Sequence, residues 1–391
     1  MAVRVLQVID TLGMGGAETW LMEVLRLWSK NGAAQMDFLT TSGRTGEFDD
    51  EARELGAKIH YLHYGRRSVL QFTSQFRKVL ARGRYDAIHD HQDYASGWHY
   101  LLGRGLLPPV RITHVHNPAY QIRSNYGVTA ARRLSARLGK HLVASYATHI
   151  TGTSRRVVTE YGFDEPRFRR VSKTALHCGF SPSRFTGNRE ASKAALCREL
   201  DWPLGAKIIL VAGRIDQSAD SDHPQTHKDS GFAVSVGIEC ARGDSTVHVL
   251  LAGALSPAVP VLQRQIAAAG LGERFKFAGV RKDIGSLMIA SDVLLFPSRG
   301  EGLGMVAVEA QAAGLPVVAS TAVPRECVVV PGLVRFVSRD RGTQEWVSAL
   351  TQAMAQPRDV AGANRLVAAS PFAVENSARA LYELYSKGVV G

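Results

Sequence analysis

Short apolar runs alternate with longer amphipathic stretches through the first half of the chain. The runs have the length of buried strands, beginning with 3–9, and the stretch 17–29 places Leu21, Val24 and Trp28 on one helical side. Further predicted strands are 36–40, 58–62, 87–89, 111–116 and 148–151, and further predicted helices are 69–82, 94–103 and 129–145. Strands separated by helices predict a parallel sheet that is covered on both faces.

The same alternation starts again in the second half, after a stretch at 178–187 that is rich in Gly, Ser and Pro. The predicted strands here are 206–212, 246–251, 275–277, 293–296 and 316–319, and the predicted helices are 231–241, 257–269, 285–289, 305–313 and 373–385. We therefore predict an α/β protein with two Rossmann-like, doubly wound domains that face a cleft. Their predicted ranges are 1–185 and 186–370, followed by a C-terminal helix in 371–391. Ligands of such sheets bind beyond the carboxyl ends of the strands.

Length and composition agree with a two-domain cytoplasmic protein. A chain of 391 residues suits two α/β domains, and 45% hydrophobic residues provide an ordinary core. Arg4 and Asp10 interrupt the apolar start, which argues against a signal peptide, and no apolar run approaches the ~18 residues of a membrane span. The four cysteines have no metal or redox spacing, so we expect buried thiols in a reducing compartment.

Positive charge is concentrated in the first half. Residues 1–180 hold 25 Lys and Arg against 15 Asp and Glu, and no carboxylate occurs between Asp93 and Glu160. Such a block fits an anionic partner, either a membrane surface or a lipid diphosphate, although a general solubility feature would look the same. We expect no nucleic-acid partner, because no recognition-helix, RNA-binding or zinc-finger pattern accompanies the charge.

The most informative stretch runs from Pro297 to Glu309, after the apolar run 292–296. A glycine-rich turn between a strand and a helix presents backbone N–H groups and a positive helix end to an anion. Glu301 stands at the mouth of this turn, and Glu309 follows about two helical turns later. Carboxylates that can accept sugar hydroxyls beside a phosphate cradle indicate a nucleotide-sugar site. The alternative is an ordinary α/β turn with one exposed and one capping glutamate.

Other strand ends carry further candidate residues. Gly13, Gly15 and Gly16 follow the first strand, where a simple tight turn is the alternative to a ligand contact. Gly213-Arg214 closes the first strand of the second half, and Arg214 and Lys228 could clamp a diphosphate or could be plain surface charges.

Histidines mark two strand ends of the first half. His114 and His116 share one face of a strand, but no third or fourth metal ligand stands at motif spacing, so we predict a polar role for His116 and a core position for His114. His89, Asp90, His91 and Asp93 form a second polar group at a strand end, which we predict to line an acceptor site together with Asn117. Asp220-Ser-Asp222 resembles a metal-binding Asp-x-Asp but lies in a polar loop, so we predict no metal there.

With these motifs the chain resembles the retaining glycosyltransferases of family 4, which have the GT-B fold, over nearly its whole length. Among them it is most similar to bacterial transferases of exopolysaccharide and surface-polysaccharide synthesis. The matching segments are Gly13 to Glu18, His116, Gly179 to Phe185, Gly213-Arg214, Lys228, Ala278 to Val280, Glu301 to Glu309, and Ala313 to Val317. The stretch from Asp292 to Ser320 is highly specific, and the other matches are supportive.

The resemblance implies a role for each matching residue. Catalysis would depend on His116, which contacts the transferred sugar, together with Glu301, Arg214 and Lys228. The donor would be a UDP-sugar or alternatively a GDP-sugar. The cations and glycines would contact its phosphates, and Glu301 its transferred sugar. Glu309 would contact the ribose, and Val280 and Arg281 the base. The donor-binding set is Gly15, Gly16, Arg214, Lys228, Val280, Arg281, Glu301, Gly302, Leu303, Gly304, Met305 and Glu309.

The implied reaction moves a hexosyl unit to a saccharide or a lipid-linked acceptor with retention of configuration. It would need neither metal nor another cofactor, and the C-terminal helix would cross back onto the first domain. One departure concerns Lys228, because the family lysine usually follows the arginine within a few residues, whereas here fourteen positions separate the two. This spacing puts the phosphate contact of Lys228 in doubt, and the inserted loop could touch the acceptor or be mobile.

Two other functions remain as alternatives. The first is an epimerase of nucleotide sugars with the same fold; a sugar phosphorylase is disfavoured, since no segment resembles the lysine site for pyridoxal phosphate. The second is a non-catalytic protein that binds anionic lipid or nucleic acid through the basic first half. The ligand-type residues of the second half argue against the second alternative.

Overall fold

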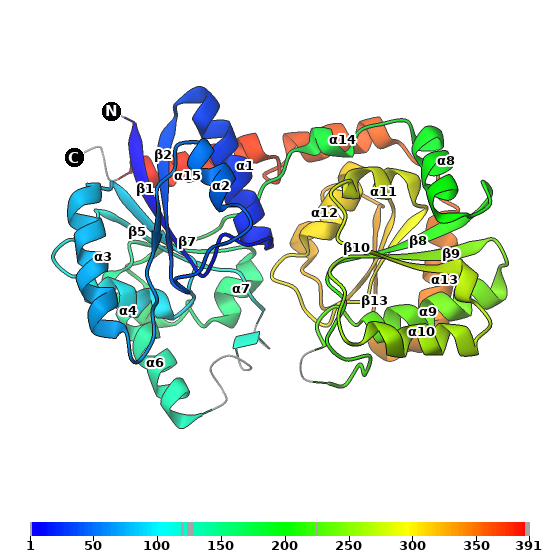
Figure 1. The fold of residues 1–391 in the computed structure, drawn as a ribbon, viewed down its shortest axis with the longest axis horizontal. Coiled ribbons are helices and arrows are strands. Elements are labelled where there is room, and N and C mark those ends of the chain that lie inside the picture. The colour runs from blue at the N-terminus through cyan, green and yellow to red at the C-terminus, as the bar shows by residue number, and fades with distance from the viewer. Residues whose placement is uncertain (1, 119–120, 123–128, 224–225, 388–391) are drawn as a thin grey trace. The chain divides into compact units, whose positions relative to one another are not determined.

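A computed structural model describes residues 2–118, 121–122, 129–223 and 226–387 of the chain. The chain forms two compact units, each with its own core (Figure 1). The N-terminal unit contains Met1–Phe180 and Pro371–Gly391, and the C-terminal unit contains Ser181–Ser370. Among the described residues, no helix combines the length and the hydropathy that crossing a bilayer requires.

The N-terminal unit is built on a seven-stranded parallel sheet with the order β3-β2-β1-β4-β5-β6-β7. Its strands are β1 (Val3–Ile9), β2 (Ala34–Thr40), β3 (Ile59–Tyr61), β4 (Ala87–Asp90), β5 (Val110–Val115), β6 (His149–Gly152) and β7 (Ser172–Ala175). Its helices up to residue 180 are α1 (Gly16–Asn31), α2 (Asp49–Glu54), α3 (Val69–Gly83), α4 (Ala95–Leu102), α6 (Ala130–Tyr146), α7 (Arg155–Glu160) and the 3-10 turn η1 (Pro166–Phe168).

Alternate residues of β1 face the two layers of helices. Leu6 and Val8 pack with Phe72 and Phe76 of α3, while Gln7, between them, faces the opposite layer and is fully buried. That opposite layer contains α1 and α15 (Val374–Ser386), which pack against each other; α15 also packs against β1, and α1 against β2 (Figure 1).

Helix α15 is anchored in the N-terminal unit by buried hydrogen bonds. The amide nitrogen of Gln7 lies 3.0 Å from the hydroxyl of Tyr385, and the indole of Trp20 donates to Ser377 over 3.1 Å. The rings of Trp28 and Tyr385 meet edge-on with centroids 6.1 Å apart. The last described helix therefore completes the layer that α1 begins.

The C-terminal unit contains a six-stranded parallel sheet with the order β10-β9-β8-β11-β12-β13. Its strands are β8 (Lys207–Ala212), β9 (Val247–Ala252), β10 (Phe275–Gly279), β11 (Val293–Phe296), β12 (Val317–Ser320) and β13 (Val334–Val337). Its helices are α8 (Arg189–Leu200), α9 (Ser230–Gly243), α10 (Val259–Ala268), α11 (Ile284–Ala290), α12 (Met305–Ala312), α13 (Gly342–Met354) and α14 (Val360–Ala369), with 3-10 turns η2 (Pro182–Phe185), η3 (Gly272–Arg274), η4 (Arg325–Cys327) and η5 (Arg339–Arg341).

Helices cover both faces of this second sheet. Residues of α9, α10 and α13 form one core with Ile209 and Val211 of β8. On the other face α8 packs on α11, and α12 packs on α14. The predicted α/β fold of two parallel, helix-covered sheets is confirmed, and in each unit the carboxyl ends of the strands share one edge where loops can collect functional side chains.

Candidate functional site

The turn from Pro297 to Gly304 joins β11 to α12 and needs glycine at its last position. Gly304 has φ 90° and ψ 54°, and a Cβ there would lie only 2.9 Å from Cγ1 of Val323. No side chain caps α12, and in the described part of the chain the N–H groups of Leu303, Gly304 and Met305 have no hydrogen-bond acceptor. This helix end is therefore suited to bind an anion.

Glu301 is held at the mouth of the turn by two neighbours. Its Oε1 accepts from the ammonium of Lys228 over 2.6 Å, and the hydroxyl of Ser298 lies 2.5 Å from the same oxygen. The ammonium also lies 5.5 Å from the ring centre of Phe296, the last residue of β11. Lys228 and Glu301 are thus brought together in one polar group, as the prediction of a shared site requires.

Glu309 lies on α12 with an unsatisfied carboxylate. It is partly buried, and its carboxylate makes no hydrogen bond to any residue that the structure describes. Burial raises the pKa of its carboxyl above the usual value, while the positive charges of Arg184 and Lys228 partly oppose that rise. Such a carboxylate has free acceptor positions for a pair of hydroxyl groups. Arg184, on η2, was not recognised from the sequence as a neighbour of this site.

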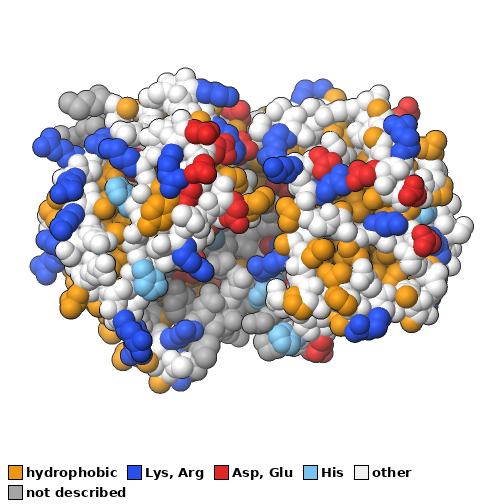
Figure 2. All heavy atoms as spheres, viewed as in Figure 1, with side chains coloured by type: hydrophobic (Ala, Val, Ile, Leu, Met, Phe, Trp, Pro, Cys, Tyr) orange, Lys and Arg blue, Asp and Glu red, His pale blue; other side chains and the backbone are white. Residues whose placement is uncertain are grey.

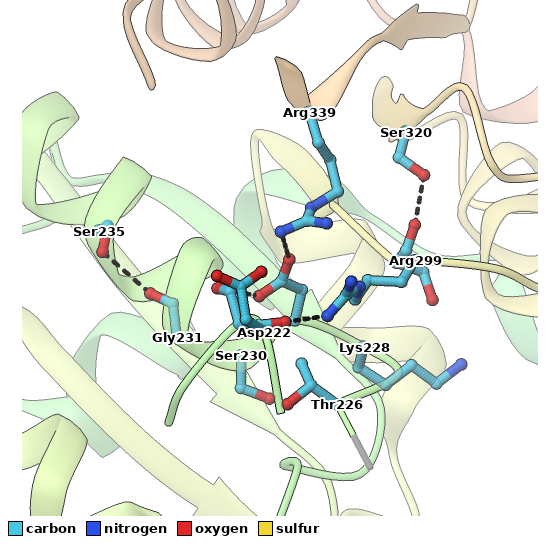
Figure 3. A network of polar contacts seen from close by, with 12 residues as sticks. Asp222, Thr226, Lys228, Ser230, Gly231, Ser235, Arg299, Ser320 and Arg339 are labelled. Carbon is cyan, nitrogen blue, oxygen red and sulfur yellow. Dashed lines mark hydrogen bonds and ion pairs between the residues drawn. The ribbon is translucent and has the colours of Figure 1, made fainter. Parts of the chain in front are cut away.

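Lys228 returns to the end of β8, beside Gly213, although thirteen residues separate it from Arg214. A Cβ on Gly213 would lie 3.6 Å from Cε of Lys228, so the chain returns to the point where the inserted loop begins. Arg214 is exposed and forms no ion pair with any carboxylate in the described ranges. Figure 3 shows the side chain of Lys228 reaching away from Thr226 and Ser230. The chain thus returns Lys228 to the end of β8, while its contact with a phosphate stays a prediction.

Val280 and Arg281, which were predicted to flank a nucleotide base, follow β10. The side chain of Val280 is exposed, whereas the guanidinium of Arg281 is paired with Glu199 and with Asp283. These ion pairs raise the pKa of Arg281 further above its ordinary value, with the hydrogen bonds to Asp283 as the largest cause. Val280 therefore offers an exposed apolar side chain, and the guanidinium of Arg281 is held in place by its two carboxylate partners.

Four histidine rings stack at the carboxyl ends of β4 and β5 in the N-terminal unit. A nitrogen of His89 lies 3.1 Å from one of His114, and a nitrogen of His91 lies 2.8 Å from one of His116. His89 also contacts the hydroxyl of Tyr385 over 2.6 Å, and His91 contacts the amide oxygen of Gln7 over 3.0 Å. Burial lowers the pKa of all four imidazoles, that of His116 to about 4, so the rings are neutral near pH 7.

Three of these rings have the proximity that a metal site requires. Ring nitrogens of His89, His91 and His114 all lie within 4.8 Å of one another, a group that sequence spacing could not reveal because the rings come from two strands. However, both nitrogens of His89 and of His91 already have hydrogen-bond partners, as does Nδ1 of His114. A metal ion would have to displace these hydrogen bonds, so the geometry favours a hydrogen-bonded stack.

Asp90 and Asn117, two further residues predicted to line the acceptor site, differ in solvent exposure. Asp90 has no exposed surface. Its carboxylate oxygens accept hydrogen bonds from Gln92, Ser96 and His99 inside the unit, so the carboxylate is not available to an acceptor substrate. Asn117 is partly exposed.

The glycine turn after β1 is exposed at the start of α1. A Cβ on Gly15 would lie 2.1 Å from Oε2 of Glu18, whereas Gly16 has nothing within 4 Å. Gly16 is thus the open position of this turn, and the carboxylate of Glu18 covers Gly15.

Two family models match the chain, one in each unit. The model described as "Glycosyl transferase 4-like domain" matches residues 15–172, and the one described as "Glycosyl transferases group 1" matches residues 232–356. The putative glycosyltransferase EpsF of Bacillus subtilis is 27% identical over 360 residues, which are 91% of this chain and 88% of that protein. A D-inositol 3-phosphate glycosyltransferase of Corynebacterium urealyticum is 29% identical over 330 residues, covering 81% of this chain and 74% of that protein.

A solved structure has the same fold. HepE of Anabaena, crystallised in complex with UDP-glucose, superimposes with a TM-score of 0.75 and 19% identity, and the match covers 98% of this chain and 99% of HepE. At this identity the likeness establishes the fold alone.

Proposed function

The chain belongs to the group 1 glycosyltransferases with the GT-B fold, and from this premise we propose that it transfers a hexosyl unit from a nucleotide-diphosphate sugar to a saccharide or lipid-linked acceptor. A UDP-sugar is the favoured donor, with a GDP-sugar as the alternative, and the product belongs to bacterial polysaccharide or glycoconjugate synthesis. One observation carries the donor assignment: the unpaired Arg214, the Lys228–Glu301 pair, the unsatisfied Glu309 and the open helix end at Gly304 belong to one edge of one sheet.

Each of these groups matches a different part of the donor. The helix end and the two cations are suited to the diphosphate, Glu309 to the ribose diol and Glu301 to hydroxyls of the transferred sugar. Val280 and Arg281 flank the base. In the N-terminal unit, Gly15 and Gly16 approach the diphosphate, the neutral imidazole of His116 contacts the transferred sugar, and His91 and Asn117 serve the acceptor.

The proposed reaction is metal-independent and retains the configuration of the anomeric carbon. The acceptor oxygen forms a bond to the anomeric carbon on the face that the leaving group departs from, while the bond from that carbon to the diphosphate breaks. The acceptor proton passes to an oxygen of the departing phosphate. Arg214, Lys228 and the N–H groups near Gly304 stabilise the negative charge that develops on that phosphate, the role that preorganised donors play in many enzymes.

Thermal-shift measurements with UDP-, GDP- and ADP-sugars test this assignment. At about 100 times Kd a bound donor adds about 2.7 kcal/mol of stability, enough to raise Tm by several degrees. We expect the largest shift with a UDP-sugar. The absence of a shift with every sugar nucleotide would contradict the proposal, and conversion of the donor sugar without any acceptor would indicate an epimerase instead.

We also expect the N-terminal unit to bind anionic membranes. Figure 2 shows Lys and Arg side chains along the side of this unit where α3 lies. Helix α6 packs Ala136 and Val143 inward, while Leu134 and Leu138, one turn apart on a basic helix, are 58% and 44% exposed. The arginines of α6 would attract lipid headgroups electrostatically, and its two exposed leucines would make apolar contact.

Vesicle flotation measures this expected binding. The chain should float with phosphatidylglycerol vesicles at low salt, and added salt should release it. Replacing Leu134 and Leu138 with Ser should weaken flotation without changing the donor-induced thermal shift. Equal flotation with neutral phosphatidylcholine vesicles would argue against the charged surface.

A further inference from the structure

The loop between Arg214 and Lys228 is closed at its base by one buried carboxylate. Asp216 is 3% exposed, and its Oδ1 accepts the N–H groups of His227 and Lys228 over 2.8 and 3.0 Å. Its Oδ2 accepts from the N–H of Ser230 over 2.9 Å, and the hydroxyl of Ser230 lies 3.2 Å from the same oxygen. Asp216 therefore joins the two ends of the inserted loop and fixes the backbone of Lys228.

The same short segment is bound from the opposite side by the glycine-rich turn. The carbonyl of His227 accepts the N–H of Arg299 over 2.8 Å and lies 2.9 Å from the hydroxyl of Ser298. Lys228 follows directly, so its backbone is held by Asp216 while its ammonium reaches Glu301 on the turn itself. Asp216 after β8 and the turn after β11, which are far apart in the sequence, thus hold the backbone and the ammonium of Lys228.

The outer part of the loop is tied down as well. The guanidinium of Arg299 donates to the carbonyl of Ser221, and the hydroxyl of Ser221 donates to Asp229 over 2.6 Å. Asp229 also pairs with Arg339. These contacts support the loop, but none of them reaches the N–H of Lys228. Among the contacts of the described residues, Asp216 makes the one to the N–H of Lys228, while Ser298 and Arg299 hold the carbonyl of the same peptide.

We propose that Asp216 is a positioning residue for donor binding: it holds the backbone of Lys228 so that the ammonium stays at the turn where a nucleoside diphosphate binds. This inference rests on the proposed function and deepens it. Without the carboxylate, the partly buried N–H groups of His227 and Lys228 and the buried one of Ser230 lose their acceptor, and the cost of leaving such groups unpaired releases the segment. The lysine would then have to be ordered by the ligand, which weakens binding.

A double-mutant cycle on phosphate-dependent affinity tests the proposal. Isothermal titration would compare UDP with uridine, and GDP with guanosine, for the wild type, Asp216→Ala, Lys228→Ala and the double variant. We expect each single change to weaken diphosphate binding about 10-fold and to leave nucleoside binding unchanged. The double variant should bind like Lys228→Ala alone, because residues that act through one another are not additive.

Two further variants support the cycle. Asp220 lies in the same loop, but among the described residues its exposed carboxylate accepts only the N–H of Asp222, so the Asp220→Ala variant should bind UDP like the wild type. Asp216→Asn keeps one acceptor oxygen and should fall between wild type and Asp216→Ala; it also serves if the alanine variant does not fold. A purely structural role would weaken nucleoside and diphosphate binding together and would lower Tm equally with and without Lys228.

The outcomes separate the inference from the function on which it rests. Wild-type protein that binds neither UDP nor GDP overturns the proposed function, and this inference with it. Wild-type binding with independent effects of the two substitutions, or with full diphosphate affinity in Asp216→Ala, overturns the inference alone.

Discussion

An Arg214→Ala enzyme is expected to lose about 100- to 1,000-fold in kcat while its KM for the donor changes far less. This is the range for removing one group that stabilises charge developing in a transition state. Arg214 stands exposed after β8, without a carboxylate partner among the described residues, so its full charge is available to the departing diphosphate. Steady-state kinetics with the donor found in the thermal-shift screen would measure both constants.

Two further variants serve as controls for the Arg214→Ala enzyme. Arg214→Lys keeps the charge but loses the bidentate geometry, so its kcat should fall between those of the wild type and the alanine variant. Arg242→Ala removes an exposed guanidinium of α9 that pairs with Glu239, and it should leave kcat unchanged. An Arg214→Ala enzyme that works at the wild-type rate would exclude the proposed role of this residue.

A Glu309→Gln enzyme is expected to bind its donor at least about 10-fold more weakly, because hydrogen bonds to a charged group are worth about 1.5–3 kcal/mol. The reason lies in the unsatisfied carboxylate, which can accept from both hydroxyls of a ribose, whereas an amide can accept through one oxygen only. Isothermal titration with UDP and GDP measures the loss directly.

The pH dependence of donor affinity gives an independent measure of the same group. Because burial raises the pKa of Glu309, its carboxylate becomes protonated at a higher pH than an exposed one. Wild-type affinity should therefore be full above that raised pKa and should fall as the pH is lowered through it, and Glu309→Gln should lose this dependence. Glu345→Gln, an exposed change on α13, should behave like the wild type. Unchanged donor affinity in Glu309→Gln would remove the ribose assignment.

Apolar runs predicted the central strands, which are buried on both faces, and also the edge strands β3 and β10, but not the edge strands β7 and β13. The apolar run 293–296 coincides with β11, and 3–9 coincides with β1. By contrast β7 has the polar sequence Ser-Lys-Thr-Ala, and β13 is partly exposed, so neither forms the continuous apolar run that marks a buried strand. Both lie at the end of a sheet, where one neighbour is missing.

The candidate site was predictable where one local segment carries it. The strand, turn and helix around Glu301 and Glu309 are contiguous, so their pattern indicated an anion site directly. The return of Lys228 to Gly213 depends on Asp216, whose four bonding partners lie eleven to fourteen positions later, and local spacing gives no sign of it. The histidine stack depends likewise on the pairing of β4 with β5, which only the folded sheet establishes.

The discontinuous N-terminal unit has a consequence for the order of folding during synthesis. Gln7, Trp20 and Trp28 leave the ribosome early, yet their partners Ser377 and Tyr385 are translated only after the entire C-terminal unit. The unit that is made first is thus completed last, and its tryptophan-rich face stays open to solvent or chaperones until the final helix arrives.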